Sequence, residues 1–435
     1  MKIVILGNGF DLASGLPTGY EHFFGHNEKK YRKELENING LLDKKNSLIF
    51  KQNTNTTVTL ELIRYIESEI MENIKKDFEP IREIVKKTKI SIWSIYFWYA
   101  KELKFRNWSD VESQISNVIK NISILSYAEP STKIVELENK IQENLYRYIE
   151  SIKTRLTVKD SNLYVDNIYQ NISREDKLRY ICDLIAKNRY ENIRDIDYIG
   201  ILKKELEYFE EDFKEYIKYI SNTIIKQKKY RYRLNFLLVA NEKDSNEENE
   251  VFLLNFNYTD FSGYKDKDIE HTEMSHEKIK TYVTQVNVHG TYHSKVLFGI
   301  DQSNNIPKEL YQFTKTYRKI EAADSIQNIK LPDPCKIDEI IIFGHSLSEA
   351  DYSYFHSIFD YYNIYDSNIK LIFKYGNHGE PSLCKSGHVQ KVMELLKIYG
   401  NKMIDRAKGE NLVHKLLLEN RLSISNVYVK QLIAK

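Results

Sequence analysis

Two glycines follow the first apolar segment of the chain at a spacing that lets a phosphate group approach the backbone. Residues 2–6 are apolar and strand-like, Gly7-Asn8-Gly9 comes next, and a helix-like segment begins near residue 10. A strand, a tight turn and a helix start place backbone amides where a pyrophosphate meets no side chain. The usual third glycine is missing, because position 12 is leucine. A plain tight turn explains Gly-x-Gly alone about as well as a phosphate-binding loop does.

Two asparagines stand at the end of a later strand-like segment. Asn255 and Asn257 follow the apolar residues 251–254. Ligands of open parallel sheets bind beyond the carboxyl ends of the strands, so these amides would point toward whatever lies on the glycine turn. An asparagine at such a place also caps helices and holds turns, and for an unplaced asparagine that structural explanation is favoured.

A histidine and a glycine end another apolar segment. His289 and Gly290 come at the end of residues 283–288. A histidine there can act as a base near neutral pH or orient a sugar hydroxyl, although a lone histidine is more often a hydrogen-bonded structural residue. The histidines between 271 and 293 lack the spacing and the carboxylates of a metal site, so we expect no metal.

Two further polar groups have both a structural and a functional explanation. Residues 337–343 end in Gly344, and Asp351 then stands either to cap the next helix or to contact a ligand. In the middle of the chain, Trp108-Ser109-Asp110 fits a core tryptophan followed by helix caps, so a functional role there needs support from elsewhere.

The elements that must position these residues follow two patterns. Only Gly40 and Gly200 occur between Gly25 and Gly263, so this stretch lacks the turn chemistry of an all-β fold and shows helical periodicity over about 27–235. Residues 241–250 form a polar linker, and short apolar runs typical of buried parallel strands then return at 251–254, 283–288, 296–298, 337–343, 369–373 and 427–429. We predict an α/β fold with a Rossmann-like parallel sheet flanked by helices, formed by 1–26 and 241–435. A large all-helical insertion, 27–240, interrupts it.

Composition narrows the classes of partner. The 435 residues include 64 Lys+Arg and 62 Asp+Glu, a net charge of +2, which gives no global electrostatic case for nucleic acid. No run of about 18 apolar residues and no signal-peptide core is present, so we expect a cytoplasmic protein without a membrane partner. Three cysteines are too few for a disulfide scaffold.

Taken together, the motifs resemble the bacteriophage abortive-infection AbiH family. The match covers most of the chain in motifs, while the helical insertion matches only at 108–112. The matching segments are Gly7 to Tyr20, Trp108-x-Asp110-x-Glu112, Asn255-Phe256-Asn257-Tyr258-Thr259, His289-Gly290, Phe298-Gly299-Ile300-Asp301 and Phe343-Gly344-His345-Ser346-Leu347-x-x-x-Asp351. This resemblance implies an antiphage defence protein.

The same motifs are also distantly similar to sirtuins and to sirtuin-like NAD-consuming domains. That similarity implies a sirtuin-like fold, with NAD as the substrate and hydrolysis to nicotinamide and ADP-ribose as the reaction. It implies Asn257, His289 and Asp11 as catalytic residues. The implied ligand-binding residues are Gly7, Asn8, Gly9, Phe10, Leu16, Pro17, Glu112, Asn255, Tyr258, Gly290, Phe298, Gly299, Asp301, Gly344, His345, Ser346 and Asp351.

The similarity also has departures that matter for function. The serine of the sirtuin pattern is Asp11 here, and the paired cysteines of the sirtuin zinc module are absent, so protein deacylation is not expected. The partners implied are NAD or a related nucleotide, a phage-derived trigger or defence protein, and a second copy of the chain. Two other functions stay open: a nucleic-acid-cleaving toxin, and a catalytically inert module that senses nucleotides or binds a partner.

Overall fold

The first strand of the chain lies inside a six-stranded sheet whose other members come much later in the sequence. In the computed structural model the strands are β1 (Lys2–Leu6), β4 (Asn249–Asn255), β5 (Thr281–Asn287), β6 (Glu339–Phe343), β7 (Lys370–Gly376) and β8 (Leu422–Val427). Their order is β5-β4-β1-β6-β7-β8, and every neighbouring pair is parallel. This is the order of the doubly wound Rossmann fold, with its reversal between β1 and β6, and it confirms the predicted fold class.

The structure describes residues 1–43, 48–51, 89–100, 108–125, 162–165, 198–222, 249–260, 281–301, 306–323, 329–376 and 381–427. It also describes single positions between 65 and 79 and between 178 and 190, and residue 230. Within these residues, none of the helices is both long enough and apolar enough to cross a membrane.

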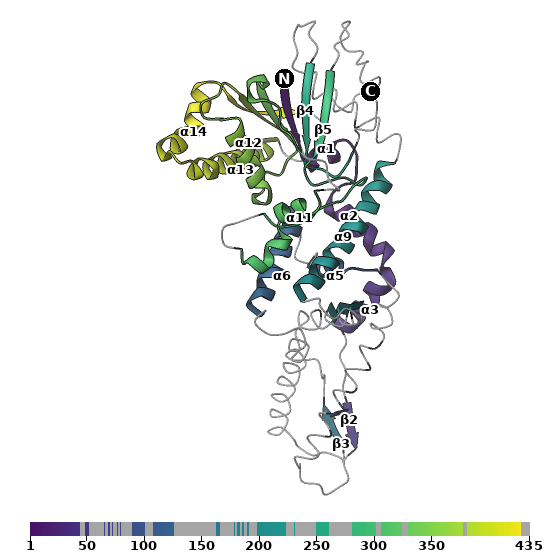
Figure 1. Cartoon of the computed structure of the whole chain (residues 1–435). Helices are drawn as coiled ribbons and strands as arrows, with labels where there is room; N and C mark the ends of the chain where they lie inside the picture. The colour runs from purple at the N-terminus through teal and green to yellow at the C-terminus, as the bar shows by residue number, and fades with distance from the viewer. Residues whose placement is uncertain are drawn as a thin grey trace. The chain divides into compact units, whose positions relative to one another are not determined.

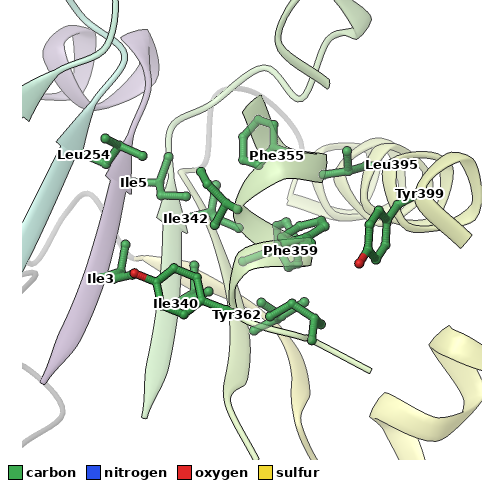
Figure 2. Close-up of a cluster of buried hydrophobic side chains, with 14 of the residues drawn as sticks. Ile3, Ile5, Leu254, Ile340, Ile342, Phe355, Phe359, Tyr362, Leu395 and Tyr399 are labelled. Atoms are coloured by element: carbon green, nitrogen blue, oxygen red, sulfur yellow. The ribbon is translucent and has the colours of Figure 1, made fainter. Parts of the chain in front are cut away.

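Strand β1 is buried on both of its faces, as a central parallel strand must be. Ile3 and Ile5 pack in one cluster with Phe355 and Phe359 of α12 (Tyr352–Tyr361). Figure 2 shows this layer, to which α13 (Pro381–Lys402) contributes Leu395 and Tyr399. α14 (Arg406–Leu418) completes the layer on that face of the sheet.

The alternate residues of β1 face a second cluster. Val4 and Leu6 pack there with Phe10 and Leu16, which lie in and after the short helix α1 (Asn8–Ala13). Side chains of successive strand residues point to opposite faces, so an uninterrupted apolar run is what a sheet covered on both sides requires. Packing on both faces holds β1 in place, and it thereby fixes the position of the glycine turn that follows Leu6.

The chain divides into two compact units. The first holds the sheet and consists of residues 1–23, 106–117 and 210–435, and the second consists of 24–105 and 118–209. The described residues 108–117 and 210–222 therefore cluster with the sheet in this division. The predicted boundaries at 26/27 and 240/241 stay a prediction.

Helices make up most of the described part of the region between β1 and β4 (Figure 1). They are α2 (Tyr20–Lys30), α3 (Arg32–Leu42), α5 (Ile92–Ala100), α6 (Trp108–Leu125) and α9 (Tyr198–Ser221). In the second unit, the buried carboxylate of Glu205 accepts hydrogen bonds from the Ile92 amide, Arg189 and Tyr190. Ser91 caps the same helix, since its Oγ accepts from the Ser94 amide, so a serine and a buried acid together satisfy the start of α5.

Two details differ from the sequence-based expectation. Residues 48–51 and 162–165 form strands β2 and β3, an antiparallel pair within a region expected to be entirely helical. Both segments are rich in aromatic and branched side chains, which favour strands once paired. The predicted strand 296–298 is wrong: only Ile300 forms an isolated bridge, with Thr314. The reason lies at Phe298, whose backbone groups bond to side chains, as described below.

The region after β5 contains short helical turns between the last strands. They are the 3-10 helices η3 (Lys308–Phe313), η4 (Pro334–Lys336) and η5 (Glu349–Asp351), with helix α11 (Lys315–Glu321) following η3. Thr314 caps α11 by accepting a hydrogen bond from the Tyr317 amide. This cap sets the first residue of α11, Lys315, at a defined place.

Candidate functional site

A cavity of about 330 Å³ lies at the carboxyl edge of the sheet, where β1 and β6 end and the strand order reverses. This volume lies within the range of small-molecule sites, and the switch point is where open α/β sheets bind their ligands. The lining combines apolar rings with polar and charged groups from the sheet-bearing unit. It includes Gly7, Asn8, Gly9, Asp11, Trp108, Glu112, Phe256, Asn257, Tyr258, His289, Lys315, Gly344, His345, Ser346, Asp351, Lys374 and His388.

The glycine turn packs directly against the turn that follows β6. The Gly7 amide donates to the Phe343 carbonyl (3.0 Å), and the Gly9 amide donates to the Gly344 carbonyl (2.7 Å). A Cβ atom on Gly7 would lie 2.4 Å from Cα of His345, and Gly344 has a φ of +69°. The glycines are thus required by contact between two turns, and both amides are already occupied within the protein.

A buried hydrogen-bonded group joins the glycine turn to the end of β4. Asn257 Nδ2 donates to Asp11 Oδ1 (2.9 Å) and to the Gly7 carbonyl (3.0 Å), and Thr259 Oγ1 donates to Asp11 Oδ2 (2.9 Å). Burial raises the pKa of Asp11 to about 7, against the opposing effect of the hydrogen bonds from Thr259 and Asn257. Asn255 holds the same loop, since its Oδ1 accepts from the Asn257 amide.

A lysine that the sequence motifs did not include lies at the charged centre of the cavity. Lys315 Nζ lies 2.7 Å from Asp351 Oδ1 and 2.9 Å from Glu112 Oε1, and it also donates to the Ala350 carbonyl. Burial alone would lower the pKa of Lys315, but the two carboxylates raise it above its usual range. The cluster therefore holds one permanent positive charge between two acids.

The two acids respond differently to this lysine. Burial would raise the pKa of Asp351, but Lys315 and the neighbouring histidines lower it well below its usual range. Burial raises the pKa of Glu112 to about 7, because the attraction of Lys315 only partly offsets the desolvation and Asp351 adds repulsion. Asp351 thus stays ionised at physiological pH, and Glu112 is the acid of this pair that can exchange a proton near neutral pH.

Two imidazoles face the carboxylate of Asp351. His345 Nε2 lies 3.4 Å from Oδ2, and the His345 Nδ1 atom accepts a hydrogen bond from the Leu347 amide. An accepting Nδ1 places the proton of neutral His345 on Nε2, directed at Asp351. His289 Nε2 lies 3.5 Å from Oδ1 of the same carboxylate.

His289 is the less satisfied of the two imidazoles. Its Nε2 atom is buried and makes no hydrogen bond within the described residues. Burial, reinforced by the charge of Lys315, lowers the pKa of His289 to about 3, so the ring is neutral at physiological pH. The aromatic rings of Phe256, Tyr258 and Tyr354 surround it. A neutral, unsatisfied nitrogen in an aromatic wall is available for a hydrogen bond with a ligand.

Residues 298–300 pass close to the start of α11 and hold the backbone of Lys315 in place. A Cβ atom on Gly299 would lie 2.6 Å from the Phe313 carbonyl, and the Ile300 carbonyl accepts from the Lys315 amide. The preceding residue, Phe298, is held by a buried ion pair: its amide donates to Glu210, and its carbonyl accepts from Arg318. These bonds take the place of a strand ladder and explain why 296–298 is not a strand.

The structure brings twelve of the predicted site residues to the cavity. They are Gly7, Asn8, Gly9, Asp11, Glu112, Asn257, Tyr258, His289, Gly344, His345, Ser346 and Asp351. Asp351 precedes α12 without a side-chain capping bond, so its carboxylate faces Lys315 instead of the helix. The predicted site residues that do not line the cavity are Phe10, Leu16, Pro17, Asn255, Gly290, Phe298, Gly299 and Asp301.

Three charged or titratable lining residues had no motif to reveal them. Lys315 begins a short helix, Lys374 lies in β7, and His388 lies in α13. Within the described ranges, no group of three or more His, Cys, Asp or Glu side chains is arranged to hold a metal ion.

These features define an α/β protein with a Rossmann strand order and a charged crevice at its switch point. The family model described as Bacteriophage abortive infection AbiH matches residues 3–375, and the chain belongs to that family. Membership indicates a role in bacteriophage abortive infection. Searches of curated proteins and of solved structures found no match. The similarity to sirtuins stays a prediction from the motifs.

Proposed function

We propose that this protein acts in abortive infection by binding NAD in the switch-point cavity and hydrolysing it to nicotinamide and ADP-ribose. The observation that carries the proposal is the buried Nε2 atom of His289, which lacks a partner among the described residues and lines that cavity. The unsatisfied nitrogen would accept a hydrogen bond from a ribose hydroxyl or from an attacking water molecule.

The strand order supports a nucleotide as the ligand. Nucleotides bind across the crevice at the reversal of a doubly wound sheet, and the cavity lies at that reversal, between the ends of β1 and β6. Trp108 and Tyr258 give it apolar ring surface, on which planar bases can lie, beside the charged group of Lys315. An apolar wall with a few convergent polar groups suits a ligand that has both bases and sugar hydroxyls.

The proposed reaction breaks the bond between nicotinamide and the ribose C1 atom. Nicotinamide leaves as a neutral molecule with the bonding electrons, water adds to the oxocarbenium-like carbon, and one proton is released. His289 accepts a hydrogen bond from that water and passes the released proton to bulk solvent. The Asp351 carboxylate, held as an anion by Lys315, supplies negative charge near the developing cation.

Asp11 and Asn257 act in this proposal by positioning. Both are buried and hydrogen-bonded to each other, and they fix the glycine turn relative to the loop that follows β4. This differs from the direct catalytic roles expected from the motifs. Phage-derived triggers, defence partners and self-association stay part of the proposal as the means by which the site is activated.

The deciding experiment is incubation of the purified full-length protein with NAD, with nicotinamide and ADP-ribose measured by chromatography. His289→Ala should retain NAD binding and lose about 10²–10⁴ in turnover, the usual contribution of a general base. His293→Ala is the matched control, because His293 is exposed and does not line the cavity. Full turnover by His289→Ala would remove His289 from the mechanism.

A second function, nucleotide binding without catalysis, is favoured by one specific observation. Both Nδ2 hydrogen bonds of Asn257 are made within the protein, as are those of the Gly7 and Gly9 amides. A glycine turn and an asparagine whose hydrogen bonds are already made within the protein suit a sensor whose bound state signals to a partner. Tight NAD binding without nicotinamide release, with and without phage infection of expressing cells, would select this function.

A further inference from the structure

Helix α11 turns two lysines toward the surroundings of His289. Lys315 and Lys319 are four residues apart, so they lie one turn apart on the same face of this helix. Lys315 contacts the Asp351 carboxylate, which faces Nε2 of His289. Lys319 donates a hydrogen bond from Nζ to the Val288 carbonyl (3.0 Å), in the peptide that joins Val288 to His289. One short helix therefore acts on the imidazole through two separate groups.

Within the described residues, the sheet supplies no donor to the Val288 carbonyl. Strand β5 ends at Asn287, and the Val288 amide still donates to the Asn255 carbonyl (2.8 Å). In a parallel ladder the amide of Asn257 would then donate to the Val288 carbonyl, but it donates to Oδ1 of Asn255 instead. Lys319 thus supplies the donor that the ladder does not, at the last peptide before the imidazole.

Lys319 also contacts an aromatic ring that packs on His289. Its Nζ atom lies 5.7 Å from the ring centroid of Tyr354, a distance at which a cation is attracted to the face of a ring. The centroid of the same ring lies 5.6 Å from that of the imidazole, at an interplanar angle of 71°. Tyr354 belongs to α12, so the lysine joins α11, the end of β5 and α12 around one imidazole.

Among the described residues, Lys319 has no carboxylate partner. Burial lowers the pKa of Lys319 to about 8, so the amine still carries its proton at pH 7. Its charge adds to the burial and to the charge of Lys315, which together lower the pKa of His289. A partly desolvated charge with no acid to offset its cost suits a functional position better than a stabilising one.

We propose that Lys319 is a positioning residue for His289: it holds the peptide before the imidazole and the Tyr354 ring beside it, and so keeps Nε2 turned into the cavity. The inference rests on the proposed function only in taking His289 to be the residue that acts on the ligand. Lys319 itself does not line the cavity, so it makes no contact with the ligand and transfers no proton.

The first test follows the imidazole itself in the full-length protein without ligand. Nitrogen-15 NMR at neutral pH compares the His289 ring signals of the wild type, Lys319→Met and Lys319→Arg, with His289→Ala used to assign them. Methionine keeps the length of the side chain and removes its charge and donor, whereas arginine keeps both. We expect Lys319→Met to shift the His289 signals and Lys319→Arg to restore most of the wild-type positions. Lys308→Met, a change of an exposed lysine in η3, should leave them in place. Unshifted His289 signals in Lys319→Met would overturn the proposal.

The second test separates positioning from ligand binding. Lys319→Met should lower kcat for nicotinamide release from NAD about tenfold, the effect of losing one charge-assisted hydrogen bond, while the Kd for ADP-ribose changes less than about twofold. Lys319→Arg should recover most of kcat. A loss of ADP-ribose binding as large as the loss of kcat would make Lys319 a ligand contact and contradict the proposal. If the wild type releases no nicotinamide, the proposed reaction fails, and the NMR comparison decides the role of Lys319 by itself.

The melting temperature shows whether the effect is confined to His289. Lys319→Met removes a partly buried charge that no acid offsets among the described residues, so the ligand-free variant should melt within about 5 °C of the wild type. A larger decrease, or a variant that does not fold, would mean that Lys319 supports the fold as a whole. That result would also contradict a role in positioning His289.

Discussion

The Nζ atom of Lys315 lies 2.7 Å from Oδ1 of Asp351, with side-chain exposures of 3% and 12%. His289 and His345 face the two oxygens of that same carboxylate. The charge of Lys315 keeps Asp351 ionised, and it adds to the burial that holds His289 neutral. This ion pair thus contributes to the charge states of two side chains of the cavity.

Replacing Lys315 with Met should destabilise the protein and change the titration of His289. Two buried carboxylates would lose their cation, and breaking such a pair costs about 3–5 kcal/mol. The pKa of His289 should rise, because the repulsion from Lys315 is removed while the attraction of Asp351 stays. Urea unfolding and histidine NMR titration measure the two effects, with Lys308→Met, an exposed change, as the control. Unaltered stability would show that the ion pair is not a structural requirement.

The pH dependence of stability should carry the signature of Asp11. Its ordinary pKa of 3.8 rises to about 7 in the folded protein. Between these values the folded state holds a proton that the unfolded state has released, so this group's contribution to the free energy of unfolding decreases as pH rises through that window. Above about pH 7 the contribution becomes constant.

Asp11→Asn is the matched variant for this effect. The amide oxygen can still accept from Asn257, and the amide nitrogen can donate to the Thr259 hydroxyl, so the contacts of Asp11 are preserved. The free energy of unfolding of the wild type relative to this variant should fall between pH 4 and pH 7. A difference that is independent of pH, measured by urea unfolding, would contradict the raised pKa.

Gly290→Ala should be severely destabilising. Gly290 has a φ of +83°, and a Cβ atom there would lie 1.7 Å from the Lys295 carbonyl oxygen. Gly40→Ala is the control, since Gly40 is helical with nothing within 4 Å of the new atom, and it should gain about 0.5–1 kcal/mol. Thermal unfolding of the two variants should show shifts of opposite sign. Equal shifts would mean that the 290–295 turn rearranges freely.

The buried pair of Arg318 and Glu210 offers a double-mutant test. Arg318→Met alone leaves Glu210 buried without a cation and should cost about 3–5 kcal/mol. Adding Glu210→Gln removes the stranded charge and should recover part of that loss, so the two changes are not additive. Additive losses in urea unfolding would show that the two side chains act independently on Phe298.

The fold was predictable from the sequence because its sheet is buried on both faces. Continuous apolar runs such as 3–6 and 340–343 are required of central parallel strands, so hydrophobicity alone locates them. The pair of β2 and β3 was not predicted, because their short runs lie inside a helical pattern. Residues 296–298 have the apolar character of a strand, but the backbone amide and carbonyl of Phe298 hydrogen-bond to the side chains of Glu210 and Arg318 instead of to another strand.

The site was predictable where it follows strand ends and unpredictable elsewhere. Gly7, Asn257, His289 and Gly344 follow parallel strands, and the carboxyl ends of such strands meet at one edge. Lys315 begins a polar, seven-residue helix and resembles a surface lysine in sequence. Its burial depends on Gly299 and on two acids that are more than 30 residues away in the sequence. A pattern of neighbouring residues therefore cannot predict that Lys315 is buried.

The position of β1 between β4 and β6 also determines when the cavity can exist during synthesis. β1 pairs first with residues from 251 onward and then with residues from 339 onward. At about 5–20 residues per second, a ribosome needs roughly 20–70 s to reach the end of β6 after making β1. Until then the glycine turn has no opposing turn at Gly344, and Asp351 has not been made. A nascent chain therefore cannot assemble the site until Asp351 has been made, so any harm that the protein does to its host begins only after the greater part of it has been translated.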